Sequence, residues 1–269
     1  MRLIISVSIL FLLSLNLISQ STLKDIAFKE GEEIQYIISY EWGAIWVDAG
    51  NVTFSVVKEE ISNQPCFHLI GVGKTTPKWD WLFKVRDRYE SWVNVNTLLP
   101  YRFKRKTDEG GWEIYNEYFF NYNKKNVITL TQSTNSKFKR DTLNITNNTF
   151  DIMTIVYLTR NLDFSKYKVN STIPITIILD NEISNIYIRY LGKEVYDSEK
   201  YGKFNCIKLG AYLIEGTIFK EGENMKIWVT DDKNRIPLMV ETPILVGSIK
   251  ARIAKVKGLK FPLSSKIKK

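Results

Sequence analysis

One histidine and one short glycine-containing segment are the first places where this sequence could do chemistry. His68 is the sole histidine of the 269 residues and no Cys-x-x-Cys pair accompanies it, so a metal site with several histidine ligands is excluded. A Ser-His-Asp triad would have to use His68, but the sequence lacks the Gly-x-Ser-x-Gly elbow of such hydrolases. Gly73-Lys74-Thr75 imitates the end of a phosphate-binding loop, yet histidine stands where that pattern needs glycine, and Pro77 disfavours the helix that must follow. We therefore interpret His68 as structural and predict no metal site and no cofactor.

Acidic residues near tryptophans are the remaining candidates for catalysis. Glycosidases need two carboxyl groups with separated pKa values, and Asp80, Asp87 and Glu90 lie close together in the sequence. Asp87 falls on the apolar side of a predicted strand, between Val85 and Tyr89, so its carboxyl should point inward. An inward carboxylate needs a partner, usually an arginine, and we favour structural pairing over catalysis. A carboxylate-based hydrolase is kept as a minor alternative.

Tryptophans are concentrated in the first half of the chain, where six of the seven precede residue 113. Five of them lie in or beside predicted bends: Trp42, Trp46, Trp79, Trp81 and Trp112. Together with Asp87, these side chains could line a groove for sugar rings or acyl chains. Packing on the sheet is the simpler role for them.

Two cysteines, Cys66 and Cys206, lie in strand-like segments. A disulfide between them is permitted in an exported chain, and it would close a loop of about 140 residues, worth about 5 kcal/mol in the chain-entropy description. Buried free thiols suit such segments equally well, and we favour free thiols.

Strands must position these residues, because apolar and polar side chains alternate along most of the chain. The predicted strands cover residues 34–42, 52–56, 66–72, 83–90, 101–104, 112–122, 127–131, 173–179, 186–190, 204–213, 226–230, 236–240 and 248–257, and residues 44–49 are predicted to form a bend. In the last strand the apolar phase slips by one residue, which predicts a β-bulge at Ile253-Ala254. The fold class is therefore mainly β: a curved antiparallel sheet, either a β-roll or a partly closed, barrel-like meander.

One short helix is predicted over residues 150–161. Asn147-Asn148-Thr149 offers N-cap residues, and Asp151 places an acid in the first turn. Because the segment is short and rich in β-branched residues, the helix should depend on docking against the sheet.

A pattern recurs on both sides of this helix: a cysteine, a Trp-Val pair 26 or 22 residues later, and a strand that opens with proline 8 or 9 residues after the tryptophan. The copies are Cys66, Trp92-Val93 and Pro100, and then Cys206, Trp228-Val229 and Pro237. We interpret them as two β-meander halves, 22–146 and 164–258, joined by a helix and connection over 147–163 within one continuous domain, 22–258. Chance similarity between hairpins is the alternative.

The first residues have the layout of a secretory signal, with Arg2, a mostly apolar stretch over 3–18 and small residues at 19 and 21. The apolar stretch is shorter than the roughly 20 residues that span a bilayer, which disfavours a retained anchor. We predict a signal peptide over residues 1–21, cleaved near residues 19–21, and a location in the periplasm or cell envelope.

The formal charge is +9, and the chain from residue 242 onward carries eight basic residues and no acidic one. Export argues against nucleic-acid binding. Weak association of the basic C-terminus, including a tail over 259–269, with an anionic membrane surface is one interpretation. A solvated strand face and a frayed tail are the simpler one.

The segment MKIWVTDDKNRIPLMVETPILVGSIKARI at 225–253 resembles the C-terminal signature of the bacterial exported proteins grouped as domain of unknown function 3108. Further matching segments are GEEI at 31–34, VRDRYE at 85–90, FDI at 150–152 and GKFNC at 202–206. The resemblance implies an envelope protein of mostly antiparallel β-structure, and it implies no catalytic residues. The Trp-Val-turn-Pro hairpins also resemble, more loosely, those of periplasmic lipoprotein carriers with half-barrel folds.

Export, extensive strand patterning and the missing catalytic motifs lead to a first hypothesis: a non-enzymatic binding or scaffold module whose partner is an envelope component or protein, with lipid or glycan as candidate ligands. The alternative is a carrier or sensor of an apolar ligand such as lipid, held on the concave side of a curved sheet under the helix. A filled interior would favour the scaffold, and an open apolar interior would favour the carrier.

Overall fold

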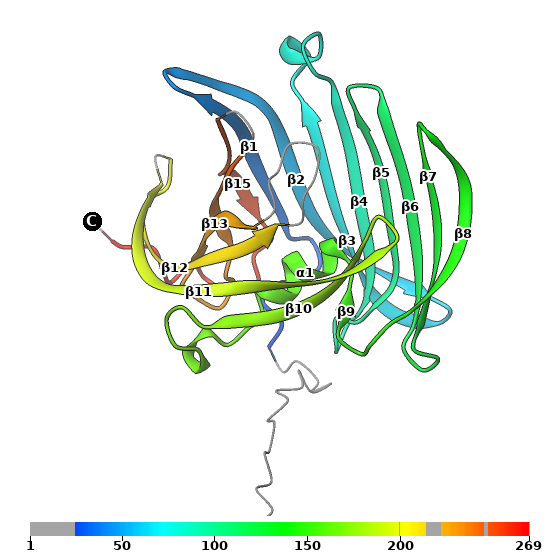
Figure 1. The fold of residues 1–269 in the computed structure, drawn as a ribbon. Coiled ribbons are helices and arrows are strands. Elements are labelled where there is room, and N and C mark those ends of the chain that lie inside the picture. Colours follow the sequence, from blue (N-terminus) through cyan, green and yellow to red (C-terminus); the bar gives the residue numbers. More distant parts are fainter. Residues whose placement is uncertain (1–24, 199, 214–221, 245–246, 269) are drawn as a thin grey trace, which may run out of the picture.

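The computed structural model describes residues 25–198, 200–213, 222–244 and 247–268. These residues form one sheet of fifteen strands, with one α-helix and two 3-10 helices (Figure 1). The strands are β1 (Glu33–Trp42), β2 (Ile45–Ile61), β3 (Gln64–Thr75), β4 (Val85–Asn94), β5 (Pro100–Glu109), β6 (Trp112–Asn121), β7 (Asn126–Ser133), β8 (Ser136–Asn144), β9 (Thr149–Phe150), β10 (Thr172–Leu179), β11 (Glu182–Ser198), β12 (Gly202–Leu213), β13 (Gly222–Thr230), β14 (Pro237–Pro243) and β15 (Ser248–Lys257). The helices are η1 (Pro77–Trp79), α1 (Ile152–Thr159) and η2 (Phe164–Lys166).

The strand order is β8-β7-β6-β5-β4-β3-β2-β1-β15-β14-β13-β12-β11-β10-β9, so the first and last strands of the chain meet in the middle of the sheet. All pairs are antiparallel except β9 with β10. The predicted bulge is confirmed: Gln35 lies opposite Lys255 and Tyr36 lies opposite Ile253, which leaves Ala254 as the extra residue.

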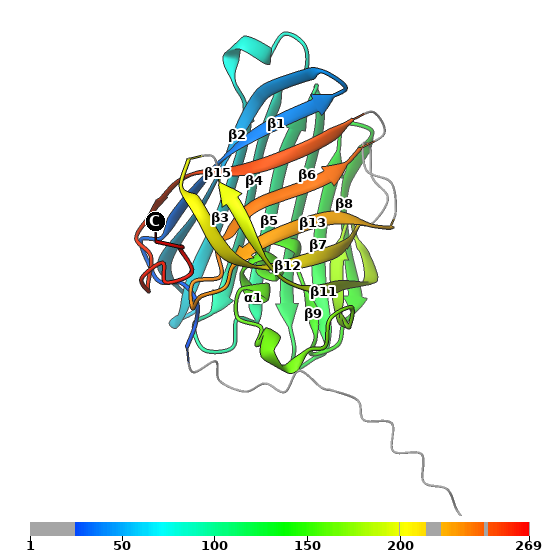
Figure 2. The same ribbon diagram turned by 90° about the vertical axis from the view of Figure 1, so that its left-hand side faces the viewer.

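The sheet curls around its own apolar face without closing (Figures 1 and 2). Its two edges are β8 and β9, and the turn between β10 and β11 reaches back to the β5–β8 region. There Asn181 donates to Asp141 at 2.9 Å, and Arg105 pairs with Asp180 at 2.9 Å. The predicted fold class, a mainly β, curved antiparallel sheet with one docked helix, is confirmed.

One predicted element is wrong, and one edge strand was missed. Of the bend expected over 44–49, only Ala44 lies in a turn, and residues 45–49 are strand. Gly43, with a φ of +57°, makes the turn tight, so that Trp46 already pairs with Glu41. Strand β8 was not predicted at all. Its side chains alternate little between apolar and polar, since this edge strand is mostly exposed and has only β7 as a neighbour.

Helix α1 begins one residue after Asp151 and ends earlier than predicted. Asp151, rather than residues 147–149, is the N-cap, and its carboxylate accepts from the Thr154 amide at 2.8 Å and from the Ser91 hydroxyl at 2.9 Å. Burial raises the pKa of Asp151 to about 6, against the lowering effect of these hydrogen bonds. Because Ser91 belongs to β4, the cap also docks the helix on the sheet.

Three apolar clusters fill the interior around the helix. Met153 and Tyr157 enter the cluster formed with β2–β7, and Ile155 enters the cluster formed with β10–β13. The expected dependence of the helix on docking is consistent with its burial, because side chains on several sides of this short element are covered.

A buried ion pair ties the end of the helix to the start of the sheet. Arg160 donates to both carboxylate oxygens of Glu32, at 2.6 and 2.9 Å, and both side chains are almost completely buried. The guanidinium also donates to the carbonyl of Asn234, in the turn between β13 and β14. One side chain therefore joins three segments that lie far apart in the sequence.

The repeated pattern has a structural counterpart. Val93 lies opposite Pro100, and Val229 lies opposite Pro237, each beside a register shift at the preceding tryptophan. Both turns also place a residue with positive φ two positions before the proline, Leu98 at +57° in the first copy and Arg235 at +45° in the second. Strands β2–β5 thus correspond to β11–β14, in the same order across the sheet.

The C-terminal segment is not frayed, contrary to the simpler interpretation of its charge. Phe261 donates its amide to Asn234, Ser265 binds Asp232, and the Ile267 amide donates to Lys203. These bonds hold residues 258–268 against the turn after β13 and the start of β12. The predicted signal peptide lies outside the described residues. None of the helices in the described part is long and apolar enough to cross a membrane.

Candidate functional site

The tryptophans singled out in the sequence gather at one end of the sheet. In an antiparallel meander, the β1–β2, β3–β4 and β5–β6 connections must all lie at the same end, and Figures 1 and 2 show them together there. Their exposed large apolar residues form what we call the aromatic rim: Trp42, Ile45, Trp46, Trp81, Leu82, Phe83 and Trp112, which are 44–78% exposed. Trp79 lies in η1, within the β3–β4 loop, and is half-buried.

The β3–β4 loop, which carries three of the rim residues, is held firmly at its base. Asp80 accepts from the hydroxyl of Thr75 and from two nitrogens of Arg86, at 2.5–3.0 Å. The hydrogen bonds from Arg86 and Thr75 lower the pKa of Asp80. Phe83 packs on Gly110, which has a φ of +64° and forms the turn between β5 and β6. Any larger residue at position 110 would place its Cβ 2.6 Å from the Phe83 ring. Asp80 is thus a structural anchor of the loop.

Cations stack on two of the tryptophans. The Arg252 guanidinium and the Lys250 ammonium lie 4.7 and 5.2 Å from the Trp46 ring centroid, and Lys78 lies 5.2 Å from the Trp79 ring. Lys250 also pairs with Glu41 at 2.5 Å. Lys250 and Arg252 of β15 are therefore engaged with Trp46 of the rim.

Asp87 lies on the inner face of β4, opposite Gly73 and Thr107. The expected arginine partner is not found: Arg105 is near enough to act on the charge of Asp87, but its ion pair is with Asp180. The buried Oδ1 of Asp87 has no hydrogen-bond partner among the described residues. Burial and the nearby charge of Glu109 raise the pKa of Asp87 to about 7.

The three carboxylates considered for catalysis do not come together. Asp80 is bound in its loop, Asp87 faces inward, and Glu90, three positions further along the same strand, faces the opposite side of the sheet. The structure therefore offers no pair formed from Asp80, Asp87 and Glu90 across one site.

His68 is enclosed on the outer face of the sheet. Its Nδ1 lies 2.8 Å from Glu59 and its Nε2 lies 3.1 Å from Glu90, and its ring stacks on Trp92 with centroids 4.2 Å apart. Trp92 donates its indole N–H to Glu59 at 2.8 Å. Burial raises the pKa of Glu59, but the hydrogen bonds from Trp92 and His68 outweigh it, so the net shift is downward. Beyond Trp92, Arg102 continues the stack at 4.7 Å.

The second repeat builds a similar cluster, with Lys208 in place of His68 and with Lys226 at the position that corresponds to Glu90. Glu194 accepts from the indole N–H of Trp228 and from Lys208, whose ammonium lies 4.9 Å from the Trp228 ring. Glu59 lies opposite Cys66 and Glu194 lies opposite Cys206, so the two glutamates occupy corresponding positions. The sequence pattern showed the cysteines and tryptophans of this repeat but missed both glutamates.

This correspondence predicts the outcome of exchanging the histidine. We expect His68→Lys to keep the free energy of unfolding within about 1 kcal/mol of the wild type, because lysine can pair with Glu59 and lie over Trp92 as Lys208 does in the other repeat. His68→Ala should cost about 2 kcal/mol, since Glu59 and Glu90 lose a partner. Urea unfolding of both variants checks this, and equal losses for lysine and alanine would refute the correspondence.

Cys66 and Cys206 are both buried and free, so the disulfide that export would permit is not formed in this structure. Burial raises the pKa of both thiols, that of Cys206 to about 12. Among the described residues, no group of three histidine, cysteine or acidic side chains could hold a metal ion. Asp232 accepts from the amides of Asn234 and Arg235, as expected for a turn residue.

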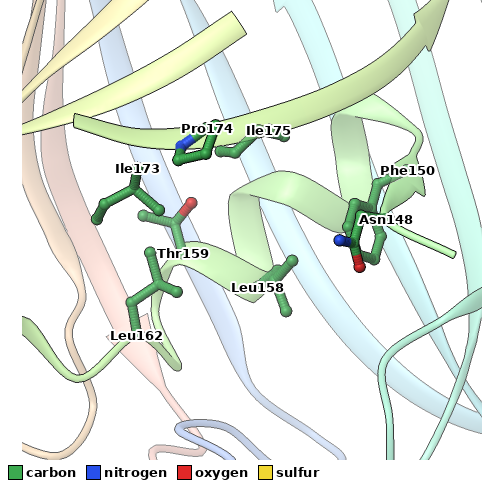
Figure 3. Close-up of a pocket in the computed structure, with 8 residues that line it drawn as sticks. All are labelled: Asn148, Phe150, Leu158, Thr159, Leu162, Ile173, Pro174 and Ile175. Atoms are coloured by element: carbon green, nitrogen blue, oxygen red, sulfur yellow. The ribbon is translucent and has the colours of Figure 1, made fainter. Parts of the chain in front are cut away.

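The space between the helix and the sheet is nearly filled. A cavity of about 20 Å³ lies beside α1 (Figure 3). It is lined by Asn148, Phe150, Leu158, Thr159, Leu162, Ile173, Pro174 and Ile175. This volume holds about one water molecule, so the site has no room for an acyl chain or a sugar ring.

A comparison with protein families settles where the chain belongs. The sequence profile of the family described as "Protein of unknown function (DUF3108)" matches residues 35–254, which include strands of both repeats and the helix. The chain belongs to the DUF3108 family. This confirms the resemblance stated from the sequence segments.

The DUF3108 chain is also similar to a solved structure, a beta-barrel-like protein of domain of unknown function DUF1849 from Brucella abortus. The two share 7% identity and a TM-score of 0.53, over 85% of this chain and 98% of the other. At this identity the likeness shows the fold alone. No curated protein matches the chain.

Proposed function

We propose that this DUF3108 protein is an exported, non-enzymatic binding protein of the cell envelope, and that the aromatic rim is its binding surface. The observation that carries the proposal is the collection of seven exposed large apolar residues from three successive hairpins at one end of the sheet. Isolated exposed apolar side chains are ordinary, but a cluster of this kind is typical of an interaction site. Tryptophan is the residue that most often dominates such sites.

The interior supports a binding module over the alternative of a carrier with ligand held under the helix. The described residues beside α1 leave a cavity of about 20 Å³, and three apolar clusters pack around the helix. Two larger hollows, of about 570 and 400 Å³, are open, and together they are lined mostly by polar and charged residues. At the level of the helix, the concave side of the sheet is thus used for the protein's own packing. The rim gathers seven of the exposed large apolar residues at one end of the sheet, where a partner can reach them.

Catalysis receives little support from the site. Asp80 anchors a loop, Glu90 is bound to His68 and Arg88, and Asp87 lacks a second carboxylate from the set considered. Export is supported by the signal-like layout of residues 1–21, namely a basic residue, an apolar stretch and small residues. A location in the periplasm or envelope is part of the proposal.

The test measures binding to bacterial envelope fragments by co-sedimentation, with the purified wild type and two variants. The rim variant carries Trp42→Ser, Trp81→Ser and Trp112→Ser, and the control carries Val169→Ser and Val195→Ser, which replace exposed apolar residues outside the rim. We expect the rim variant to bind at least tenfold more weakly and the control to bind like the wild type. Equal binding by all three proteins, or no binding by the wild type, would contradict the proposal.

A further inference from the structure

We propose that the partner met by the rim is the surface of a lipid bilayer, and that the β3–β4 loop is the part that enters it. This inference rests on the proposed function, because it names the partner of the same surface. It differs from the association expected of the basic C-terminus, since residues 258–268 are docked against the sheet.

The tip of the loop has the composition of an interfacial anchor. Trp81, Leu82 and Phe83 are consecutive, and they are 78%, 66% and 52% exposed. Figures 1 and 2 show this loop projecting beyond the neighbouring hairpins at the rim end of the sheet. Three consecutive apolar side chains on a projecting tip offer a narrow wedge, which suits a deformable apolar phase better than a flat protein surface.

The base of the β3–β4 loop is held in place by contacts within the chain. The bonds of Asp80 to Thr75 and Arg86, and the packing of Phe83 on Gly110, fix the backbone in the absence of any partner. A preorganised loop loses little conformational freedom on binding, so more of the gain from burying its apolar side chains remains.

The charges around the tip fit the headgroup level of a bilayer. Exposed Lys78 and Lys84 flank the apolar residues, and Lys78 stacks on the ring of Trp79. Tryptophan and lysine are the residues that occupy the boundary between headgroups and acyl chains. The formal charge, which is +9 for the full sequence and +8 once Arg2 is removed with the predicted signal peptide, adds attraction toward anionic lipid.

Two neighbouring hairpins supply a second level of contact. Trp42 and Ile45 pair across the β1–β2 turn, and Trp112 begins β6 beside the turn that Phe83 covers. These side chains are 44–54% exposed. A bilayer reached by the tip of the β3–β4 loop would meet them next, which gives one continuous apolar contact around this end of the sheet.

The experiment uses vesicles of phosphatidylethanolamine with one quarter phosphatidylglycerol, without any protein. Binding is measured by co-sedimentation, and insertion is measured by quenching of tryptophan fluorescence with lipids brominated near the headgroup. We compare the wild type with a double variant, Trp81→Ser and Leu82→Ser, which leaves Phe83 on Gly110. The control again carries Val169→Ser and Val195→Ser.

We expect the wild type and the control to bind and to be quenched, and the double variant to bind at least tenfold more weakly. Far-ultraviolet circular dichroism and urea unfolding establish that the double variant is folded. Undiminished vesicle binding by a folded double variant would overturn the inference. Rim-dependent binding to envelope fragments without any binding to pure lipid would also overturn it while leaving the proposed function standing. If the wild type bound neither the vesicles nor the envelope fragments, both the inference and the proposed function would be overturned.

Discussion

Replacing Arg160 by methionine should lower the free energy of unfolding by about 3–5 kcal/mol, because it leaves the carboxylate of Glu32 buried without its partner. Both side chains of this pair are at most 3% exposed, and the guanidinium also satisfies the carbonyl of Asn234. Burial lowers the pKa of Arg160, but the charge and the hydrogen bonds of Glu32 outweigh that effect, so the net shift of the Arg160 pKa is upward and the guanidinium stays charged. Urea unfolding at pH 7 measures the loss.

The double variant Glu32→Leu with Arg160→Met distinguishes the cost of an unpaired buried charge from the cost of altered packing. It removes both charges, so it should recover a large part of the loss seen with methionine alone. Lys166→Ala, which breaks an exposed pair with Asp163 at 3.4 Å, should cost less than about 1 kcal/mol and serves as the control. A loss for Arg160→Met as small as that of the control would show that the ion pair does not join the helix to the sheet.

Replacing Asp87 by asparagine should make the protein more stable at pH 8 and less sensitive to pH. The pKa of Asp87 is raised in the folded protein from an ordinary value near 3.8 to about 7, so the fold favours the neutral form. The stabilisation linked to this proton is complete below about pH 4 and is lost as the pH rises through 7. Because the group is partly open to solvent, we expect a gain of about 1–2 kcal/mol for asparagine at pH 8 and little difference at pH 4.

Urea unfolding of the wild type and the variant at intervals from pH 4 to pH 8 checks this. Asp151, whose pKa is also raised, contributes equally to both curves of stability against pH, so the difference between the curves reports on Asp87. Asp163→Asn is the control. The hydrogen bond from Ser165 lowers the pKa of Asp163, so it titrates below this range and its removal should leave the slope unchanged. A variant curve parallel to that of the wild type would mean that Asp87 is ionised in the folded protein.

Most strands could be predicted from alternation because most of them have one covered face. Strand β1 shows this well, since Ile34 and Tyr36 are buried while Glu33 and Gln35 are more exposed. The bulge at Ala254 was visible for the same reason: a one-residue slip reverses which side chains face the core. The edge strand β8 carries no such signal, because few of its side chains are covered.

The site was harder to predict than the strands. Clustering of the tryptophans at one end follows from the hairpin order, but their exposure does not, because a tryptophan near a turn can fold inward or outward. We expected an arginine beside Asp87 because a buried carboxylate usually pairs with one. Arg105 instead forms its ion pair with Asp180, which lies 75 positions away in the turn between β10 and β11. Such long-range competition between partners leaves no trace in the local sequence.

The pairing of β1 with β15 has a consequence for how the chain reaches this structure. Glu33 lies opposite Lys257, so the hydrogen-bonding edge of β1 that faces β15 stays open until nearly the whole chain has been made. Contacts of such long sequence separation form slowly, since closing a large loop costs entropy before any bond is gained. Until then β1 is bonded to β2 alone and is an edge strand of the early meander. An open edge of this kind can pair with other chains, so the nascent protein is most exposed to aggregation in this interval and most in need of a chaperone.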